Sequence, residues 1–270
     1  MQWEVGFSKH IGGRGEQQDS VGAQLSADGR RCLIALADGM GGHRGGAQAS
    51  RLVVRAAESV WTQVETEAAG DAKDILRQAC GTAHRDIVEL GRLHGLDPHT
   101  TCVMLLVQDN QATWMHIGDS RCYRIQSGSI VSRTRDHSVV QLLVDMKEVN
   151  ETQMGNHPDQ NKLLRSLGGS ADPDAEIESA AVREGDGFVL CSDGLWESVS
   201  PEEIARSLNA RSLQEEADRL AELAAERGGD EGDNVSIALA RAVGEAKPNS
   251  YSAQRGAGNS LVNRMIRIVK

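Results

Sequence analysis

The chain has 270 residues, which allows one large domain or two small ones around a sizeable core. Its formal net charge is −10 and no run is rich in Lys or Arg, which argues against nucleic acid or an anionic membrane surface as a partner. No window approaches the roughly 18 apolar residues of a membrane span, and the N-terminus lacks a secretory pattern. We therefore expect a cytoplasmic protein without membrane insertion.

Cysteine usage points to the same compartment. The chain has five cysteines, an odd number, and no two of them form a C-x-x-C pair. Four lie in apolar, strand-like runs and Cys80 lies in a helical one. This pattern is typical of buried, reduced thiols in a cytosolic protein.

Short apolar runs bounded by turn residues predict many strands. In chain order, the predicted strands are Glu4–Ser8, Val21–Ser26, Cys32–Ala37, Thr101–Gln108, Gln111–Ile117, Cys122–Gln126, Glu176–Ala181, Phe188–Cys191 and Val235–Ala242. Asp109 and Asn110 separate two of these strands and leave no room for a helix, so those two strands are expected to form a hairpin.

A helical period of apolar residues predicts two long helices, over Gly46–Glu65 and Asp74–Leu93. Capping patterns predict three more. Their N-caps are Ser138, Ser200 and Ser212. Ser138 also starts an S-x-x-Q capping box, which Gln141 completes. The last helix is expected to run to Arg227, with Gly228 as its C-cap.

The order of these elements favours antiparallel sheets faced by helices over a βαβ alternation. From about Gly244 the sequence becomes polar and rich in Gly and Ser. We expect one domain over residues 1–243 and a flexible tail over 244–270. A docking role for the terminal LVNRMIRIVK is the alternative to a frayed tail.

Acidic residues beside Gly or Asn recur at the ends of the predicted strands. They are Asp19, Asp38, Asp119, Asp193 and Asp233. A single Asp-Gly is ordinary turn chemistry, but several carboxylates brought together by neighbouring strands repel one another. A hard divalent cation with oxygen ligands, Mg²⁺ or Mn²⁺, would neutralise them. Gly39 would let a backbone carbonyl or metal-bound water come close, and Arg14 suits bidentate phosphate binding.

These segments resemble the metal-dependent protein phosphatases of the protein phosphatase 2C family, especially its compact bacterial members. The matching blocks, in chain order, are Arg14 with Gln17–Ser20, Asp38–His43, Gly118–Arg121, Asp136–Ser138, His157-Pro158 with Leu163–Gly168, Ser192–Trp196 and Asp233–Asn234. Each block alone is a weak signal, but their succession from about Trp3 to Val243 is specific.

The resemblance implies an α+β fold, in which two antiparallel β-sheets pack as a sandwich with helices on both outer faces (α-β-β-α). It implies a centre of two Mn²⁺ or Mg²⁺ ions. Asp38 would bridge both ions, Asp193 and Asp233 would complete one site, and the carbonyl of Gly39 would complete the other.

The remaining roles also follow from the resemblance. Asp19 would hold metal-bound waters, and Asp119 would join Asp193 in a third, weaker metal site. Arg14 would bind the substrate phosphate, so Arg14 and Asp38 are the expected catalytic residues. The segment Val139–Gln160 corresponds to the family's variable flap, which His137 is expected to anchor.

The implied activity is hydrolysis of phosphoserine and phosphothreonine in proteins by a water shared between the metals. The chain would act as a monomer on phosphoproteins and oppose a cognate bacterial serine/threonine kinase. Two alternatives remain open: a catalytically silent phosphoprotein-binding domain, and a phosphatase for anti-sigma-factor antagonists.

Three positions depart from the family pattern. Gln17 replaces the usual Asn, and His99 stands where relatives usually have Gly. Met40 occupies the position of a histidine proposed as general acid in eukaryotic relatives. A metal-bound water is the alternative proton donor, and a structural role is favoured for the nearby His43.

Overall fold

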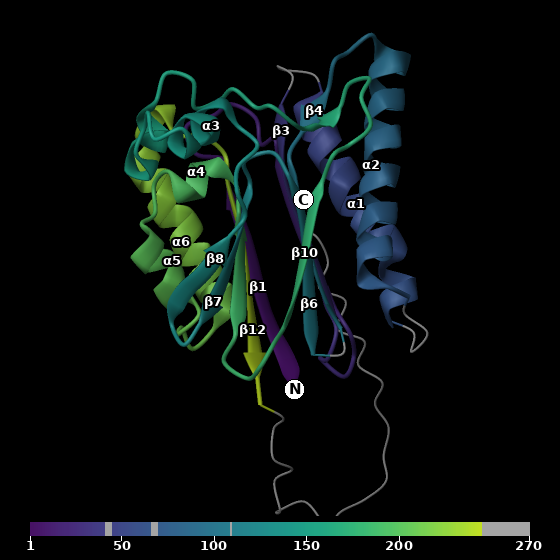
Figure 1. Ribbon diagram of the computed structural model, residues 1–270, viewed down its shortest axis with the longest axis vertical. Coiled ribbons are helices and arrows are strands. Elements are labelled where there is room, and N and C mark those ends of the chain that lie inside the picture. The colour runs from purple at the N-terminus through teal and green to yellow at the C-terminus, as the bar shows by residue number, and fades with distance from the viewer. Residues whose placement is uncertain (41–44, 66–69, 109, 245–270) are drawn as a thin grey trace, which may run out of the picture.

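Two antiparallel sheets pack face to face, and helices cover both outer faces (Figure 1). The computed structural model describes residues 1–40, 45–65, 70–108 and 110–244. The predicted α-β-β-α sandwich is confirmed. Among the described helices, none combines the length and apolar character that crossing a membrane requires.

Each sheet is built from ladders that are antiparallel throughout. The five-stranded sheet has the order β1 (Gln2–His10), β12 (Val235–Val243), β11 (Gly187–Cys191), β7 (Arg121–Gln126) and β8 (Ser129–Arg133). The seven-stranded sheet has the order β10 (Glu176–Ala181), β6 (Gln111–Ile117), β5 (Cys102–Gln108), β3 (Cys32–Met40), β4 (His99–Thr100) and β9 (Leu167–Gly168), and β2 (Asp19–Leu25) pairs with β3.

The helices divide between the two faces. The seven-stranded sheet is covered by α1 (Gly46–Glu65) and α2 (Ala72–His94), whereas the five-stranded sheet is covered by α4 (Asp193–Trp196), α5 (Pro201–Ser207) and α6 (Leu213–Gly228). Three short helices, α3 (Val139–Asp145) and the 3₁₀ turns η1 (Glu151–Asn156) and η2 (Gly229–Glu231), lie in connections.

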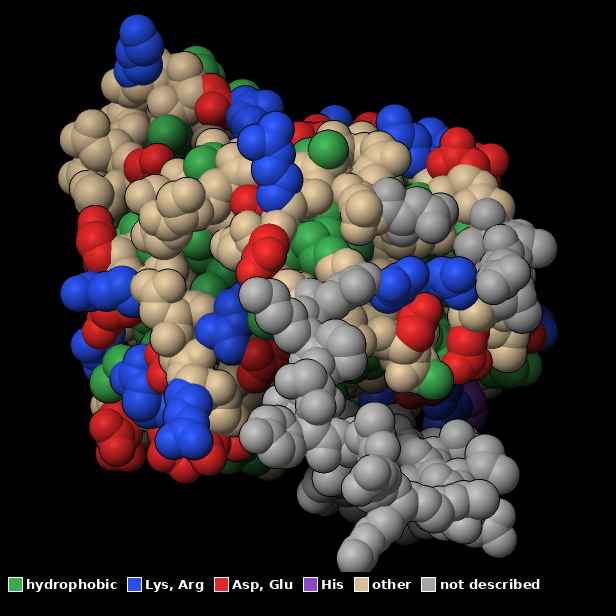
Figure 2. Space-filling view, turned by 90° about the horizontal axis from the view of Figure 1, so that it is seen from below, with side chains coloured by type: hydrophobic (Ala, Val, Ile, Leu, Met, Phe, Trp, Pro, Cys, Tyr) green, Lys and Arg blue, Asp and Glu red, His purple; other side chains and the backbone are tan. Residues whose placement is uncertain are grey.

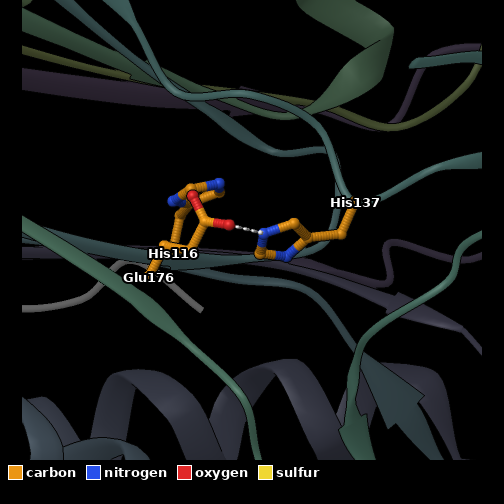
Figure 3. A group of neighbouring side chains, drawn as sticks. All are labelled: His116, His137 and Glu176. Carbon is orange, nitrogen blue, oxygen red and sulfur yellow. Dashed lines mark ion pairs between the residues drawn. The ribbon is translucent and has the colours of Figure 1, made fainter. Parts of the chain in front are cut away.

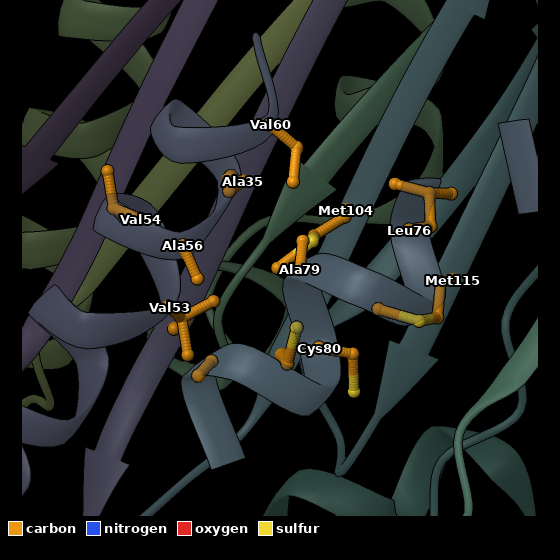
Figure 4. Packing of buried hydrophobic residues seen from close by; sticks show 14 of the residues in the cluster. Ala35, Val53, Val54, Ala56, Val60, Leu76, Ala79, Cys80, Met104 and Met115 are labelled. Carbon is orange, nitrogen blue, oxygen red and sulfur yellow. The ribbon is translucent and has the colours of Figure 1, made fainter. Parts of the chain in front are cut away.

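Strand β3 is buried on both faces, which accounts for the four-layer arrangement. Residues Cys32–Ala37 are all buried, without the alternation of a strand that has one solvated face. Leu33 and Ala35 pack under the helices, in the cluster with Val53, Leu76 and Met104 that Figure 4 shows. Ile34 and Leu36 point the other way and pack between the sheets. A strand covered on both sides therefore reads as a continuous apolar run.

Most predicted elements are present, with corrected ends. The β5–β6 hairpin is confirmed, and Asn110 in its turn has φ 59°. Helix α2 begins earlier than predicted because the side chain of Asp71 accepts a hydrogen bond from the N–H of Lys73. The predicted C-cap Gly228 is wrong by one residue, because Gly229 adopts φ 62° and its N–H bonds to the carbonyl of Ala225.

The capping patterns have different outcomes. Ser200 forms a complete box with Glu203. Ser138 caps its helix by accepting a hydrogen bond from the N–H of Gln141, but the predicted box there is wrong. The side chain of Gln141 instead accepts a bond from Arg133 and donates one to Asp145. Two charged side chains therefore bind the side chain of Gln141 in place of the backbone N–H of Ser138.

The two ends of the sandwich differ in character. The predicted acids lie at the start of β2, in β3, before β7, after β11 and before β12, and the pairing of these strands brings them to one edge of the sandwich. Strand β3 reaches this edge at the top of Figure 1. At the opposite end, acidic and basic side chains intermingle on the described surface (Figure 2). The topology thus gathers the predicted carboxylates at one edge.

Candidate metal centre

One cavity at this edge brings together six of the predicted site residues. Its volume is about 610 Å³. The predicted residues in its wall are Arg14, Asp38, Gly39, Asp119, Asp193 and Asp233. The seventh, Asp19, is only 2% exposed and faces Asp38 across the β2–β3 ladder.

Antiparallel pairing accounts for this convergence. Asp193 is the first residue of α4, separated by one residue from the end of β11, and Asp233 lies just before β12. Because β11 and β12 run antiparallel, the end of one strand meets the start of the other. Asp119 precedes β7, which pairs with the other edge of β11. Three residues from distant parts of the chain therefore share one strand edge.

The backbone of Asp38 is held on both sides by a pair of threonines. The N–H of Asp38 donates to Oγ1 of Thr101 at 2.9 Å. Its carbonyl accepts hydrogen bonds from Oγ1 of Thr100 at 2.7 Å and from the N–H of Thr101 at 2.8 Å. These partners fix the peptide units around Asp38, so its carboxylate is presented from a rigid strand end.

Asp19 occupies a more enclosed position. Oγ of Ser192 donates to its Oδ2 at 2.7 Å, while Oδ1 is buried with no hydrogen-bond partner among the described residues. Gln17 holds the backbone here, since its Oε1 accepts from the N–H of Asp19 at 2.8 Å and its Nε2 donates to the carbonyl of His10 at 2.9 Å. The glutamine that departs from the family pattern thus positions Asp19.

The carboxyl groups that line the cavity, and Asp19 beneath it, raise one another's pKa values. Burial, followed by the charges of Asp19 and Asp119, raises the pKa of Asp38 well above its usual value. Burial and the charge of Asp38 do the same to the pKa of Asp193. Burial is also the main cause that raises the pKa of Asp119 to about 7 and that of Asp19 to about 6. Each of these carboxyl groups therefore keeps its proton to a higher pH than usual unless a positive charge lies beside it.

The donor set fits a hard cation. Carboxylate oxygens dominate the cavity wall, and one buried oxygen, Oδ1 of Asp19, is unpartnered. The described lining contains no Cys or His, which zinc and copper prefer. Mn²⁺ and Mg²⁺ take oxygen ligands and tolerate several waters in their shells. The residues present therefore fit the predicted metals.

Arg14 lies in the wall beside Asp233. Its Nε donates to Oδ1 of Asp233 at 3.0 Å and its Nη2 donates to Oδ2 at 2.8 Å. The hydrogen bond and charge of Asp233 raise the pKa of Arg14 above its usual value. Arg14 is thus a permanent positive charge at an otherwise acidic site.

Asp119 is held through its main chain. Nε1 of Trp196 donates to the carbonyl of Asp119 at 3.0 Å. The guanidinium of Arg121 lies 3.5 Å from the centre of the Trp196 ring and binds both carboxylate oxygens of Asp136, at 2.9 and 2.6 Å. Trp196 therefore holds the main chain of Asp119 while its ring packs against the guanidinium of Arg121 in a cation–π contact.

The sequence places Asn234 and Leu163 in matching motifs but assigns them no role in the site. Asn234 accepts a hydrogen bond from the N–H of Gln18 at 2.7 Å and donates to the carbonyls of Ile11 and Glu16, so it ties the loop of Arg14 to β12. Leu163 lines the cavity from the flap side. The motif positions of Asn234 and Leu163 were visible in the sequence, but their hydrogen-bonding partners were not.

Of the two positions considered for a residue that protonates the leaving group, 40 and 43, only position 40 belongs to the described residues. Met40 lines the cavity and carries no ionisable proton. His43 lies outside the described residues, as does the rest of 41–44 in the block that begins at Asp38.

Comparisons with known proteins agree with this arrangement. A sequence model described as Protein phosphatase 2C matches residues 8–227. The serine/threonine protein phosphatase PstP of Mycobacterium tuberculosis is 37% identical over 257 residues, which cover 92% of this chain and 47% of that protein. The chain thus spans about half the length of this mycobacterial relative.

One further relative, and the catalytic domain of PstP taken alone, are covered almost completely. The serine/threonine phosphatase Stp of Listeria monocytogenes is 33% identical over 234 residues, covering 84% of this chain and 90% of that protein. The crystal structure of the catalytic domain of PstP with two manganese ions aligns at a TM-score of 0.77 and 32% identity, covering 90% of this chain and 99% of that one. By its sequence and its fold, this chain belongs to the protein phosphatase 2C family.

Proposed function

We propose that this chain is a metal-dependent serine/threonine protein phosphatase, which hydrolyses phosphoserine and phosphothreonine in proteins. The observation that carries the proposal is the group of buried carboxylates whose pKa values are raised around one cavity, with Arg14 in its wall. Relatives named as serine/threonine phosphatases support it, as does the relative that binds two manganese ions.

The chain would hold two Mn²⁺ or Mg²⁺ ions and a third, weaker one. Asp38 would serve both catalytic ions, Asp193 and Asp233 would complete one site, and the carbonyl of Gly39 would complete the other. Asp19 would hold waters of the centre. Asp119, with Asp193, would bind the third ion. When bound, such ions lower the pKa of water and neutralise charge on phosphoryl oxygens.

The protein's own contribution is orientation and charge. Arg14 can present two parallel N–H donors to a phosphoryl group, as it does to Asp233. Its positive charge would offset the charge that develops on the equatorial oxygens. Met40 offers no proton, so the leaving oxygen would take its proton from another donor.

The wider setting is also proposed. We expect the substrates to be phosphoproteins and the chain to oppose a cognate serine/threonine kinase. A cytoplasmic location is supported by five buried, free cysteines. A monomeric state remains a prediction that light scattering would test. The domain division at residues 243 and 244 also stays a prediction, and the tail from 245 onward lies outside the described residues.

The decisive experiment compares hydrolysis of a phosphothreonine peptide by the wild-type chain in EDTA, Mg²⁺ and Mn²⁺ with that by Asp193→Asn. We expect activity that requires metal. Loss of a partner that merely orients a metal ligand costs about 10- to 100-fold, so loss of a ligand should cost more than that.

Asp218→Asn serves as the matched control, because Asp218 is an exposed residue of α6 whose side chain accepts a hydrogen bond from Gln214. A folded wild-type chain that is inactive with every metal would refute the proposal. Equal turnover by Asp193→Asn and the wild type would refute the metal assignment.

A further inference from the structure

A group of three residues outside the cavity has no role in the proposed reaction. Figure 3 shows His116 of β6, Glu176 of β10 and His137, which lies between β8 and α3. His116 and Glu176 are paired across the β6–β10 ladder, and the rings of the two histidines stack with centres 4.6 Å apart. Both histidines are buried, whereas Glu176 is exposed.

A metal site is the first interpretation to test. The three residues offer ligand atoms within 4.8 Å of one another, and two histidines with one glutamate are a zinc-binding combination. The ring planes, however, differ by only 22°. The lone pairs of imidazole lie in the ring plane, so those of two stacked rings run side by side and do not converge on one ion.

The hydrogen bonds of His137 also oppose a metal. Its Nδ1 accepts from the N–H of Gly118 at 3.2 Å, so Nδ1 carries no proton and Nε2 does. Nε2 lies 3.3 Å from Oε1 of Glu176. Burial, and then the neighbouring His116, lower the pKa of His137, which favours the neutral ring. Metal binding at Nε2 would place a proton on Nδ1, directly against the N–H of Gly118.

His137 forms a second hydrogen bond with Gly118, through its backbone. The backbone N–H of His137 donates to the carbonyl of Gly118 at 2.9 Å. Gly118 has φ 101°, and a Cβ on it would lie 2.7 Å from the side chain of Thr101. Thr101 is itself a partner of Asp38. Gly118 is therefore confined between His137 and Thr101, and it immediately precedes Asp119 in the cavity wall.

His137 and its neighbours also hold the other side of the cavity. The carbonyl of His137 accepts from the N–H of Leu164 at 2.8 Å. Ser138 forms an isolated antiparallel bridge with Leu163, and the N–H of Val139 donates to the carbonyl of Lys162 at 2.9 Å. One short stretch therefore contacts both the turn that carries Asp119 and the segment that carries Leu163.

We propose that His137 is a positioning residue of the metal centre, which holds the Gly118–Asp119 turn in register with the Leu163 segment. Oε1 of Glu176 lies 3.3 Å from Nε2 of His137 without a well-formed hydrogen bond, and its charge favours the proton on Nε2, which leaves Nδ1 free to accept from Gly118. The third ion, which Asp119 would help to bind, is the one whose affinity depends on the contact between His137 and Gly118. The inference rests on the proposed function for its metal site, but it is tested by metal binding and not by turnover.

The experiment compares three forms of the full chain, stripped of metal with EDTA and titrated with Mn²⁺ by calorimetry and by electron paramagnetic resonance of free Mn²⁺. His137→Leu removes the acceptor for the N–H of Gly118. His137→Asn keeps one, because Oδ1 of Asn stands near the position of Nδ1. We expect His137→Leu to weaken the weakest Mn²⁺ site by about 10- to 100-fold and His137→Asn to restore most of that affinity.

Glu176→Leu and Glu178→Leu provide a second pair of variants in case His137→Leu does not fold. Both glutamates are exposed on β10, but the contact with His137 belongs to Glu176. Weakened Mn²⁺ binding in Glu176→Leu, with wild-type binding in Glu178→Leu, would support the proposal. Wild-type Mn²⁺ affinity at every site in folded His137→Leu would overturn it, as would stoichiometric Zn²⁺ binding that His116→Ala abolishes.

Peptide hydrolysis measured on the same samples keeps the two proposals apart. A wild-type chain that binds Mn²⁺ but hydrolyses nothing refutes the phosphatase activity, while the binding data still decide the role of His137. A wild-type chain that binds no Mn²⁺ overturns both.

Discussion

Arg14 and Asp233, which lie 219 positions apart in the chain, form a two-pronged ion pair in the wall of the cavity. Their side chains remain 53% and 35% exposed. An ion pair that is this solvated contributes little to folding stability. The position of Arg14 is therefore better explained by what it binds than by what it stabilises.

Replacement of Arg14 should affect substrate binding and leave folding unchanged. We expect Arg14→Ala to lower kcat/KM for a phosphothreonine peptide by about 10- to 100-fold, the equivalent of one or two charge-assisted hydrogen bonds. The melting temperature should hardly change. Arg77→Ala is the control, because Arg77 also forms an exposed ion pair, with Asp74 on α2. Equal losses in both variants would contradict the role of Arg14.

The acidic centre should make the metal-free protein less stable as pH rises. The pKa of Asp119 is raised to about 7, so the folded chain keeps this proton after the unfolded chain has lost it. Stability from this group is complete below the unfolded pKa of about 4 and falls as pH rises towards 7. Asp119→Asn removes the effect.

Thermal melts in EDTA between pH 4.5 and 7.5 would measure this difference. We expect the melting temperature of Asp119→Asn to exceed that of the wild type by a margin that grows with pH, at about 2–4 °C for each kcal/mol. A constant margin would contradict the raised pKa. Saturating Mn²⁺ should reduce or reverse the margin, because it stabilises the wild-type folded state.

Gly39 is required by a close approach of two backbones. A Cβ at this position would lie 2.0 Å from the carbonyl oxygen of Gly46, at the start of α1. We expect Gly39→Ala to destabilise the fold by about 1–3 kcal/mol or more, because the helix must move away from the strand. Gly81→Ala is the matched control, since a Cβ at Gly81 in α2 meets open space.

The control should have the opposite sign, because alanine favours the helix over glycine by about 0.5–1 kcal/mol. Chemical denaturation of both variants gives the comparison. Similar free energies of unfolding for Gly39→Ala and the wild type would show that α1 can shift without cost.

The buried pair of Arg121 and Asp136 should be sensitive to loss of one partner. Their side chains are 7% and 1% exposed. We expect Asp136→Ala to lower the free energy of unfolding by about 3–5 kcal/mol, because it leaves the guanidinium buried and unpaired. Asp74→Ala, which breaks an exposed pair on α2, should cost less than about 1 kcal/mol. Denaturant melts that show equal costs would contradict the burial argument.

The sequence by itself determined which elements form and which residues carry the chemistry. Apolar runs such as Cys32–Ala37 and the helical period of Gly46–Glu65 are local signals, and both elements are present as predicted. The acids were visible because each stands at the start or end of an apolar run, and all except Asp19 have Gly or Asn as a neighbour. The family resemblance then supplied the sandwich architecture, which local periodicity could not specify.

Only the tertiary structure decided how those residues are held. The threonine that binds the N–H of Asp38, the asparagine that ties the loop of Arg14 to β12 and the histidine that binds Gly118 act through hydrogen bonds between residues 63, 223 and 19 positions apart. The predicted capping box of Gln141 also failed, although the competing partners are local: Arg133 and Asp145 lie 8 and 4 positions away, and their side chains bind that of Gln141. Local patterns record what a segment prefers alone. Partners and pKa values depend on which distant groups the fold brings within a few ångströms, and on the water that burial removes.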